Sequence, residues 1–254
     1  MTVRASASLL ALLFTLAGCG VVRDVTGADS AAPAGPSHAD ELRGAAEALD
    51  QGPYSFQFRT PTTIGAGAVD GSDGWLRIRV VGGDVGKARV TFEVLRRDGR
   101  HLVRSNPLTG DRWTRLDMSR VDPARRPALE RFGDPAHARD LLAGASAVER
   151  DGERRYRGTL DLSRAVDPET SRLVDAEHLA ALTAEQARAV PFEATADAGQ
   201  RLLGLRFTLP AAGGRPEQPS EISYSQHGFE PDLSAPFAGK LEPAPATVYD
   251  FVNS

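Results

Sequence analysis

The side chains that most often carry catalysis are few in this chain, and none shows catalytic spacing. The 254 residues hold five histidines and one cysteine. No two histidines stand at metal-ligand spacing, so we expect each of them on the surface. The serines form neither a Gly-x-Ser-x-Gly elbow nor a Ser-x-x-Lys pair, and no glycine-rich phosphate loop follows a strand-like run. The sequence therefore predicts no catalytic residue, no metal site and no cofactor.

The single cysteine, Cys19, directly follows a short apolar stretch at the N-terminus. Arg4 supplies a positive charge before it, and no charge occurs from Ala5 to Gly18. The stretch is shorter than the roughly 20 apolar residues that span a bilayer. Its length and its charged start are typical of a secretory signal. Because Cys19 has no second cysteine to pair with, the chain cannot form an intramolecular disulfide.

The run Leu16-Ala17-Gly18-Cys19 resembles the lipobox of the bacterial prolipoprotein family. This resemblance implies that the signal is cut before Cys19 and that the Cys19 sulfur carries a diacylglycerol. Two acyl chains would hold the protein stably on the outer face of the cell membrane, where one chain would hold it only marginally. The alternative is an ordinary signal peptide with an incidental cysteine.

Composition divides the chain into three parts. Residues 1–18 form the predicted signal peptide, and residues 19–36 hold the lipidated cysteine and a flexible tether rich in Ala, Gly, Ser and Pro. Residues 37–254 form the predicted folded body, which is long enough for one sizeable core. The net charge of −4 gives no basic face for nucleic acid.

Helix signals occur at the start and in the middle of the body. Ser37 and Asp40 form a helix-start pattern, and apolar residues at helical spacing then continue toward Gly52. Three Asp-Pro pairs, at residues 122, 134 and 167, offer an Asp cap with Pro at the first helical position. We expect further helices over 136–142 and over 175–189, the second in two pieces because Thr183 and Gln186 form a capping box.

Alternating apolar and polar residues predict about ten strands. Period-two alternation is typical of an antiparallel sheet with one apolar face, and Asp-Gly pairs at residues 70, 98 and 151 mark hairpins. The proline-rich C-terminal tail is expected to be irregular. These elements predict an α+β fold, with helices on one side of one sheet. The expected strands are 54–59, 76–80, 90–94, 101–104, 112–116, 147–150, 154–162, 192–196, 202–209 and 221–225.

Several strand-like runs resemble the LolA-like bacterial lipoproteins, in particular the mycobacterial LppX/LprG group. The runs are 110–116 around Trp113, the Asp-Gly hairpin 148–161, the paired strands 191–207, and 222–225 with its Gly-x-x-Pro…Ala-Pro exit. The resemblance implies a strongly curved antiparallel half-barrel, covered by short helices, around an apolar cavity that takes up lipid chains. It implies no catalytic residues. Ala194 and Ala196 depart from the family pattern, in which larger residues are usual, so the cavity's size and shape stay open.

Two interpretations of the apolar face remain. Its alternating side chains either line a ligand cavity or fill a core. In the first case the protein binds a lipid or glycolipid and carries or presents it in the cell envelope. In the second it is a sensor or interaction module that regulates a membrane-protein partner, and an envelope hydrolase is the third possibility. The candidate cavity residues are Phe56, Phe58, Ile78, Val80, Phe92, Val94 and Phe207.

Replacing Cys19 tests the predicted lipid anchor. Cys19→Ser removes the sulfur that would be acylated, so the variant should leave the membrane fraction and appear in the soluble fraction. Cell fractionation followed by immunoblotting measures this directly. A variant that stays with the membranes as the parent does would show that the anchor lies elsewhere.

Overall fold

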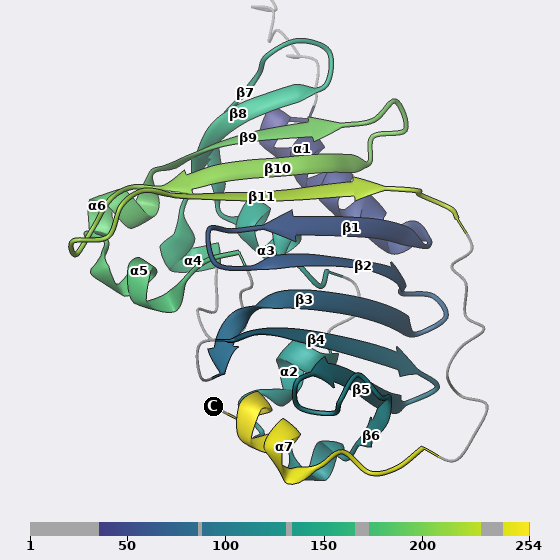
Figure 1. Ribbon diagram of the computed structural model, residues 1–254. Coiled ribbons are helices and arrows are strands. Elements are labelled where there is room, and N and C mark those ends of the chain that lie inside the picture. The colour runs from purple at the N-terminus through teal and green to yellow at the C-terminus, as the bar shows by residue number, and fades with distance from the viewer. Residues whose placement is uncertain (1–35, 86–87, 131–133, 166–172, 230–240, 254) are drawn as a thin grey trace, which may run out of the picture. The chain divides into compact units, whose positions relative to one another are not determined.

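One antiparallel sheet of eleven strands dominates the computed structural model of the chain (Figure 1). The structure describes residues 36–85, 88–130, 134–165, 173–229 and 241–253. The sheet runs in the order β6-β5-β4-β3-β2-β1-β11-β10-β9-β8-β7, so β6 and β7 are its edges. The predicted signal, Cys19 and nearly all of the tether lie outside the described residues, as does the Asp-Pro pair at residue 167.

All ten predicted strands occur, and an eleventh, β2, was not predicted. Hairpins join β2 to β3, β4 to β5 and β7 to β8 at the Asp-Gly pairs, as expected. The strands are β1 (Tyr54–Arg59), β2 (Ile64–Asp70), β3 (Trp75–Val85), β4 (Ala88–Arg97), β5 (Arg100–Asn106), β6 (Thr114–Leu116), β7 (Ala145–Arg150), β8 (Arg155–Leu160), β9 (Val190–Ala196), β10 (Leu202–Leu209) and β11 (Gln218–Ser225).

Strand β2 escapes prediction because its centre consists of glycine and alanine. Gly65 pairs with Phe58 and Gly67 pairs with Phe56 on the neighbouring β1. A Cβ atom on Gly65 would overlap the Phe58 ring, and one on Gly67 would lie 2.7 Å from Phe56 Cζ and overlap a carbonyl oxygen of β3. The glycines therefore make room for aromatic rings that reach across β2.

Two predicted helix starts are confirmed with their capping boxes. Ser37 and Asp40 cap the first helix, which passes through a 3-10 turn to Gly52, and Thr183 and Gln186 cap the sixth. The helices are α1 (His38–Glu47), α2 (Arg126–Glu130), α3 (Ala138–Ala143), α4 (Leu162–Ala165), α5 (Ala176–Ala181), α6 (Ala184–Arg188) and α7 (Ala246–Val252), with 3-10 turns at Ala48–Gln51 and Met118–Arg120.

The Asp-Pro pairs at residues 122 and 134 do not start helices. Asp122 Oδ1 accepts a hydrogen bond from the Ala124 backbone at 2.9 Å, which closes a turn, and α2 begins later, at Arg126. Asp134 Oδ2 accepts from the Arg139 backbone at 2.7 Å, although His137 is the residue that precedes α3. Both aspartates bind nearby backbone amides, but the chain turns once more before each helix forms.

The C-terminal tail is not irregular throughout, because it ends in α7. The prolines that led to the irregular prediction all precede this helix, and the last of them, Pro245, is its N-cap. Val248 and Tyr249 of α7 are buried, and the Tyr249 hydroxyl accepts a hydrogen bond from the Asp117 backbone at 3.0 Å. The tail therefore anchors the β6 end of the sheet, where Pro243 also forms a bridge with Arg115.

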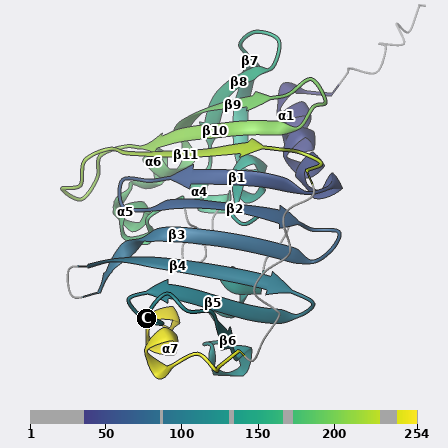
Figure 2. The same ribbon diagram turned by 45° about the vertical axis from the view of Figure 1, so that its right-hand side comes forward.

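The two faces of the sheet differ in polarity. On the inner face, alternate side chains of the strands join one apolar cluster with residues of the helices. Figure 1 shows α1 and α3 behind the sheet, on this face, and Figure 2 shows α1 there from a second direction. On the outer face, charged and small polar side chains predominate, and a small second cluster is centred on Trp75, Leu95 and Leu102. Helices on one side of an antiparallel sheet confirm the α+β prediction.

A buried carboxylate lies beneath the inner face. Asp134 is 2% exposed, and its Oδ1 has no hydrogen-bond partner among the described residues. Burial raises the pKa of Asp134 to about 6, although backbone hydrogen bonds from Arg139 and Ala138 oppose this shift. Burial also raises the pKa of Tyr224 well above its usual value, and the charge of Asp134 raises it further.

Substitution of Gly67 tests the close approach of β1 and β3 to β2. Gly67→Ala should lower the free energy of unfolding by about 1–3 kcal/mol, because the added methyl group overpacks the core. The control is Gly44→Ala in α1, where a Cβ meets nothing within 4 Å. It should add up to about 1 kcal/mol, because alanine favours a helix. Equal effects of the two variants in denaturant unfolding would contradict this account.

Replacement of Asp134 tests the buried carboxylate. Its native pKa exceeds the ordinary value of 3.8, so between pH 4 and 6 the native state binds more protons than the unfolded state. Raising the pH through this range therefore lowers stability, by roughly 3 kcal/mol in total. Asp134→Asn lacks this loss and should gain stability relative to the parent as the pH rises from 4 to 7. Exposed Asp73→Asn is the control, and a constant difference for Asp134→Asn across this range would contradict the assignment.

Candidate functional site

All seven candidate cavity residues lie on the inner, helix-covered face of the sheet. Pairing across β1, β2, β3 and β4 aligns them in two rows. One row crosses from Phe58 over Gly65 to Val80 and Phe92. The other row crosses from Phe56 over Gly67 to Ile78 and Val94, and Phe207 lies on the same face of β10.

The helices cover these residues unequally. Phe56, Phe58, Ile78, Val94 and Phe207 are buried in the main apolar cluster. Val80 and Phe92 are only half-buried and pack against the edge of that cluster. The Phe92 ring lies 5.4 Å from the ring of Phe251 in α7, measured between centroids. The unpredicted α7 thus covers part of the face.

A pocket opens on the inner face beside the turn between β1 and β2. Its volume is about 310 Å³, and two candidate residues, Phe58 and Val80, contribute to its lining. Apolar Leu173 and Val174 precede α5 and form the opposite side. The remaining lining residues are Thr60, Thr62, Thr63, Asp175 and Gln218. The pocket therefore combines apolar side chains that adjoin the core with a polar rim.

Polar side chains fix the rim of this pocket. The Asp175 side chain accepts a hydrogen bond from the His178 backbone at 2.7 Å, which caps α5. Arg215 Nη1 lies 3.4 Å from Asp175 Oδ1. The Thr63 backbone donates to Thr60 Oγ1 at 3.0 Å and closes the turn between β1 and β2. One side of the opening is therefore fixed by the capped start of α5, and the other side by the turn between β1 and β2.

The outer face carries a ladder of alternating charge over six neighbouring strands. Strand pairing aligns its members one after another across the sheet, and ion pairs join two neighbouring pairs: Arg157 to Glu149 at 3.1 Å and Arg206 to Glu221 at 3.2 Å. Opposite charges that face each other on adjacent strands stabilise the pairing. In order from β7 to β1, the ladder is Glu149, Arg157, Glu193, Arg206, Glu221 and Arg59.

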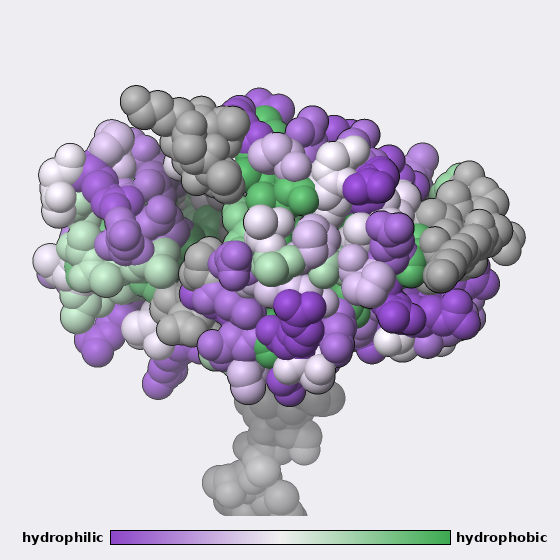
Figure 3. Space-filling model, turned by 60° about the horizontal axis from the view of Figure 1, so that its bottom comes forward, coloured by the Kyte–Doolittle hydropathy of each residue, from purple (hydrophilic) through white to green (hydrophobic). Residues whose placement is uncertain are grey.

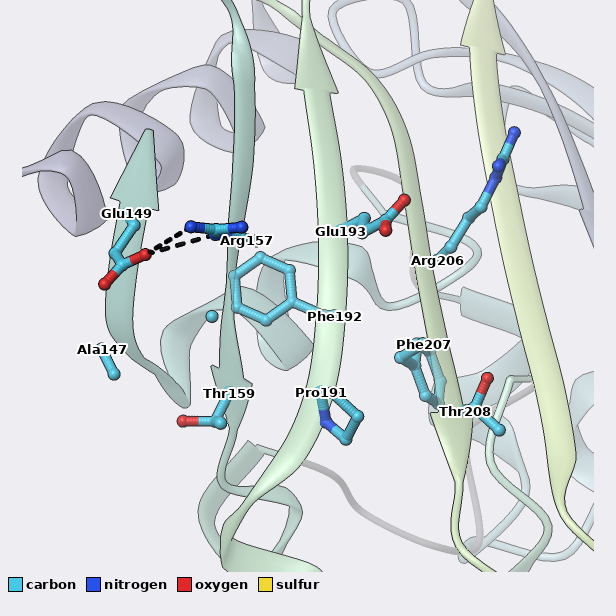
Figure 4. Close-up of a pocket in the computed structure, with 11 residues that line it drawn as sticks. Ala147, Glu149, Arg157, Thr159, Pro191, Phe192, Glu193, Arg206, Phe207 and Thr208 are labelled. Carbon is cyan, nitrogen blue, oxygen red and sulfur yellow. Dashed lines mark hydrogen bonds and ion pairs between the residues drawn. The ribbon is translucent and has the colours of Figure 1, made fainter. Parts of the chain in front are cut away.

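Part of this ladder borders a second, shallow pocket of about 660 Å³ over β7–β10. Figure 4 shows the Glu149–Arg157 ion pair on β7 and β8, with Glu193 and Arg206 on the next two strands. Because each of these charges has an opposite charge on a neighbouring strand, the pocket offers no excess charge to a ligand. We therefore place the candidate site at the inner-face pocket.

The histidines correct one prediction. His101, His137 and His178 are buried, although we expected every histidine on the surface. His178 Nε2 lies 2.8 Å from the carbonyl oxygen of Pro210, and His137 Nδ1 lies 3.2 Å from Asp140 Oδ2. Burial lowers the pKa of His101. Within the described ranges, no three His, Cys, Asp or Glu side chains form a group that could hold a metal ion.

Long-range packing hid several features of the site from sequence reasoning. The alternation predicted which side chains share the inner face, but the contribution of 173–175 follows no local pattern.

Across the described residues, no helix has the length and apolar character needed to cross a membrane. Comparison of the chain with models of known protein families and with curated protein sequences finds no match.

Proposed function

We propose that the protein binds acyl chains of a lipid or glycolipid between its sheet and its helices, with entry at the pocket beside Phe58 and Val80. One observation carries this proposal. Val80 and Phe92, at one end of the row that begins with Phe58, are apolar side chains on the inner face that are only partly covered. Val80 and its row partner Phe58 border an open pocket of about 310 Å³. Apolar surface that adjoins an opening is a suitable site for a lipid chain.

The breadth of the inner face supports the same proposal. Buried apolar side chains from ten of the strands contribute to it, from Tyr156 on β8 to Leu116 on β6. Figure 3, in which the bottom of Figure 1 comes forward, shows hydrophobic residues exposed among hydrophilic ones on that side of the molecule. In the proposed state the sheet is a strongly curved half-barrel whose concave side encloses the lipid, as the resemblance to LolA-like lipoproteins implies.

The pocket's size limits what it holds without rearrangement. A volume of 310 Å³ lies at the lower end of ligand pockets, which hold about 300–1,000 Å³. It accommodates part of one acyl chain, so uptake of a whole lipid requires the helices to move away from the buried part of the face. The proposed carrier is tethered through Cys19 to the outer face of the membrane, where it would receive and present its lipid.

A second candidate is an interaction module that regulates a membrane partner. The observation that favours it is the burial of five of the seven candidate residues in one packed cluster. A fully packed inner face would leave the polar outer face of the sheet as the binding surface. In that case the protein would recognise its partner through the charged side chains of the strands.

Substitution of Val80 separates the two candidates. If the pocket beside it is a lipid entry, Val80→Phe should place its ring in open space, change stability by less than about 1 kcal/mol and reduce lipid uptake. The control is Val94→Phe. Val94 lies on β4, two residues from Phe92, and its side chain is only 4% exposed. This change should overpack the core and cost about 1–3 kcal/mol.

The measurement uses residues 37–254 of the parent and of both variants, expressed in cells and extracted for mass spectrometry of bound lipids. The carrier proposal expects acyl lipids with the parent and a clear reduction with Val80→Phe. A lipid-free parent, together with equal destabilisation by Val80→Phe and Val94→Phe, would reject the carrier and favour the interaction module.

A further inference from the structure

The outer face of the sheet contains a pocket that the proposed lipid site does not use. It has a volume of about 330 Å³ and lies over the centre of β2. Ala66, Gly67 and Ala68 form its floor, because their small side chains leave a depression between β1 and β3. Trp75 and Phe229 border it, and Phe229 is 56% exposed, the most exposed large hydrophobic side chain among the described residues.

Three arginines and one glutamate form the charged wall of this pocket. Glu93 is 3% exposed and lies between two of the arginines. Its Oε1 accepts from Arg77 Nε at 2.7 Å, and its Oε2 accepts from Arg104 Nη2 at 2.5 Å. Burial alone would raise the pKa of Glu93, but the hydrogen bonds from Arg104 and Arg77 outweigh it and hold the pKa below its usual value. Glu93 is therefore an ionised group that fixes both guanidinium groups.

The third arginine, Arg79, is placed differently. It pairs with Glu93 across β3 and β4, yet within the described residues it makes no hydrogen bond or ion pair. Both oxygens of Glu93 already accept from Arg77 and Arg104. Arg79 is thus an exposed cation at the mouth of a pocket whose only carboxylate is engaged by two others.

Charge is not balanced here as it is elsewhere on the same face. The ladder over β7–β11 and β1 alternates one arginine with one glutamate, whereas this pocket holds three arginines and one glutamate. Asp111 approaches Arg104 at 3.7 Å from outside the lining. A local excess of arginine in a chain of net charge −4 produces a positive potential that attracts anions.

We propose that this outer pocket binds an organic anion, a phosphate or carboxylate joined to a small apolar or aromatic group. Arg79 holds the anionic group, together with the guanidinium N–H groups of Arg77 and Arg104 that Glu93 leaves free, because a guanidinium carries five donors. The alanines of the floor and the exposed ring of Phe229 cover the apolar part. The pocket volume restricts that part to the size of a single ring or a short chain.

Phenyl phosphate is a suitable probe because it joins a phosphate to one aromatic ring. The protein is the full chain carrying Cys19→Ser, so that no lipid anchor takes part. Calorimetry measures the affinity, and tryptophan fluorescence reports on the site, because both tryptophans of the chain, Trp75 and Trp113, belong to the outer-face cluster. We expect saturable binding that weakens as salt is added.

Two arginine variants separate a built pocket from diffuse attraction. Arg79→Gln removes the exposed cation and should weaken binding about tenfold or more, as loss of a charged hydrogen bond does. Arg100→Gln removes the same charge from an exposed position on the same face of β5, outside the pocket, and should change affinity less than twofold. We avoid Arg104 as a test, because its loss leaves the buried Glu93 with one partner and threatens the fold.

Three further results decide the proposal. Ala66→Phe fills the floor of the pocket, so it should abolish binding of phenyl phosphate while the circular dichroism spectrum stays unchanged. Inorganic phosphate should bind to the parent at least fivefold more weakly than phenyl phosphate does. Phosphatidylglycerol vesicles that displace the probe would identify a lipid headgroup as the natural source of the anion, and no displacement would indicate a soluble one. Absence of saturable binding, equal effects of Arg79→Gln and Arg100→Gln, or equal affinity for inorganic phosphate would overturn the proposal.

Discussion

Aromatic rings that cross a glycine strand hold the centre of the sheet together. Phe56 and Phe58 of β1 extend over Gly67 and Gly65 of β2, which pair on their other side with Ile78 and Val80 of β3. This contact fixes the register of three strands, because a shift by one residue would turn the rings to the outer face and place alanines beneath the helices. Because the neighbouring strands pair in register with these three, they continue the same apolar inner face and polar outer face.

That separation explains why the outer face can carry so much charge. Its side chains do not contribute to the main core, so charged pairs there fix strand alignment at low desolvation cost. Each exposed cross-strand pair contributes only about 0.2–1 kcal/mol, and salt screens it. The Glu93 cluster is a different case, because its carboxylate is buried and depends on Arg77 and Arg104 for compensation. Single charges of the exposed pairs can therefore be lost at little cost in stability, whereas Glu93, Arg77 and Arg104 depend on one another.

Patterns within short stretches of sequence predicted the strands, the residues that share one face, and two helix starts. Alternation located ten strands and assigned seven residues to one face, and two capping boxes located helix starts. Strand β2 was missed because its glycines serve rings on another strand, and the buried His178 was missed because its partner, Pro210, lies 32 residues away. Likewise, alternation places Val80 and Val94 on one face but cannot tell that Val94 is buried and Val80 only half-buried. Burial of the site depends on contacts distant in sequence.

The dimensions of the elements explain why coverage of the inner face is uneven. Eleven strands at a spacing of about 4.8 Å make a flat sheet about 50 Å wide, whereas α1, the longest helix of the described residues, has 10 residues and extends about 15 Å. The other helices of the described residues have four to seven residues. Helices this short cannot cover so wide an apolar face alone, so residues between them, such as Leu173 and Val174, also pack against it. Beside Val80 the cover comes from Leu173 and Val174, which precede α5, and it is incomplete, because Val80 stays half-buried beside an open pocket.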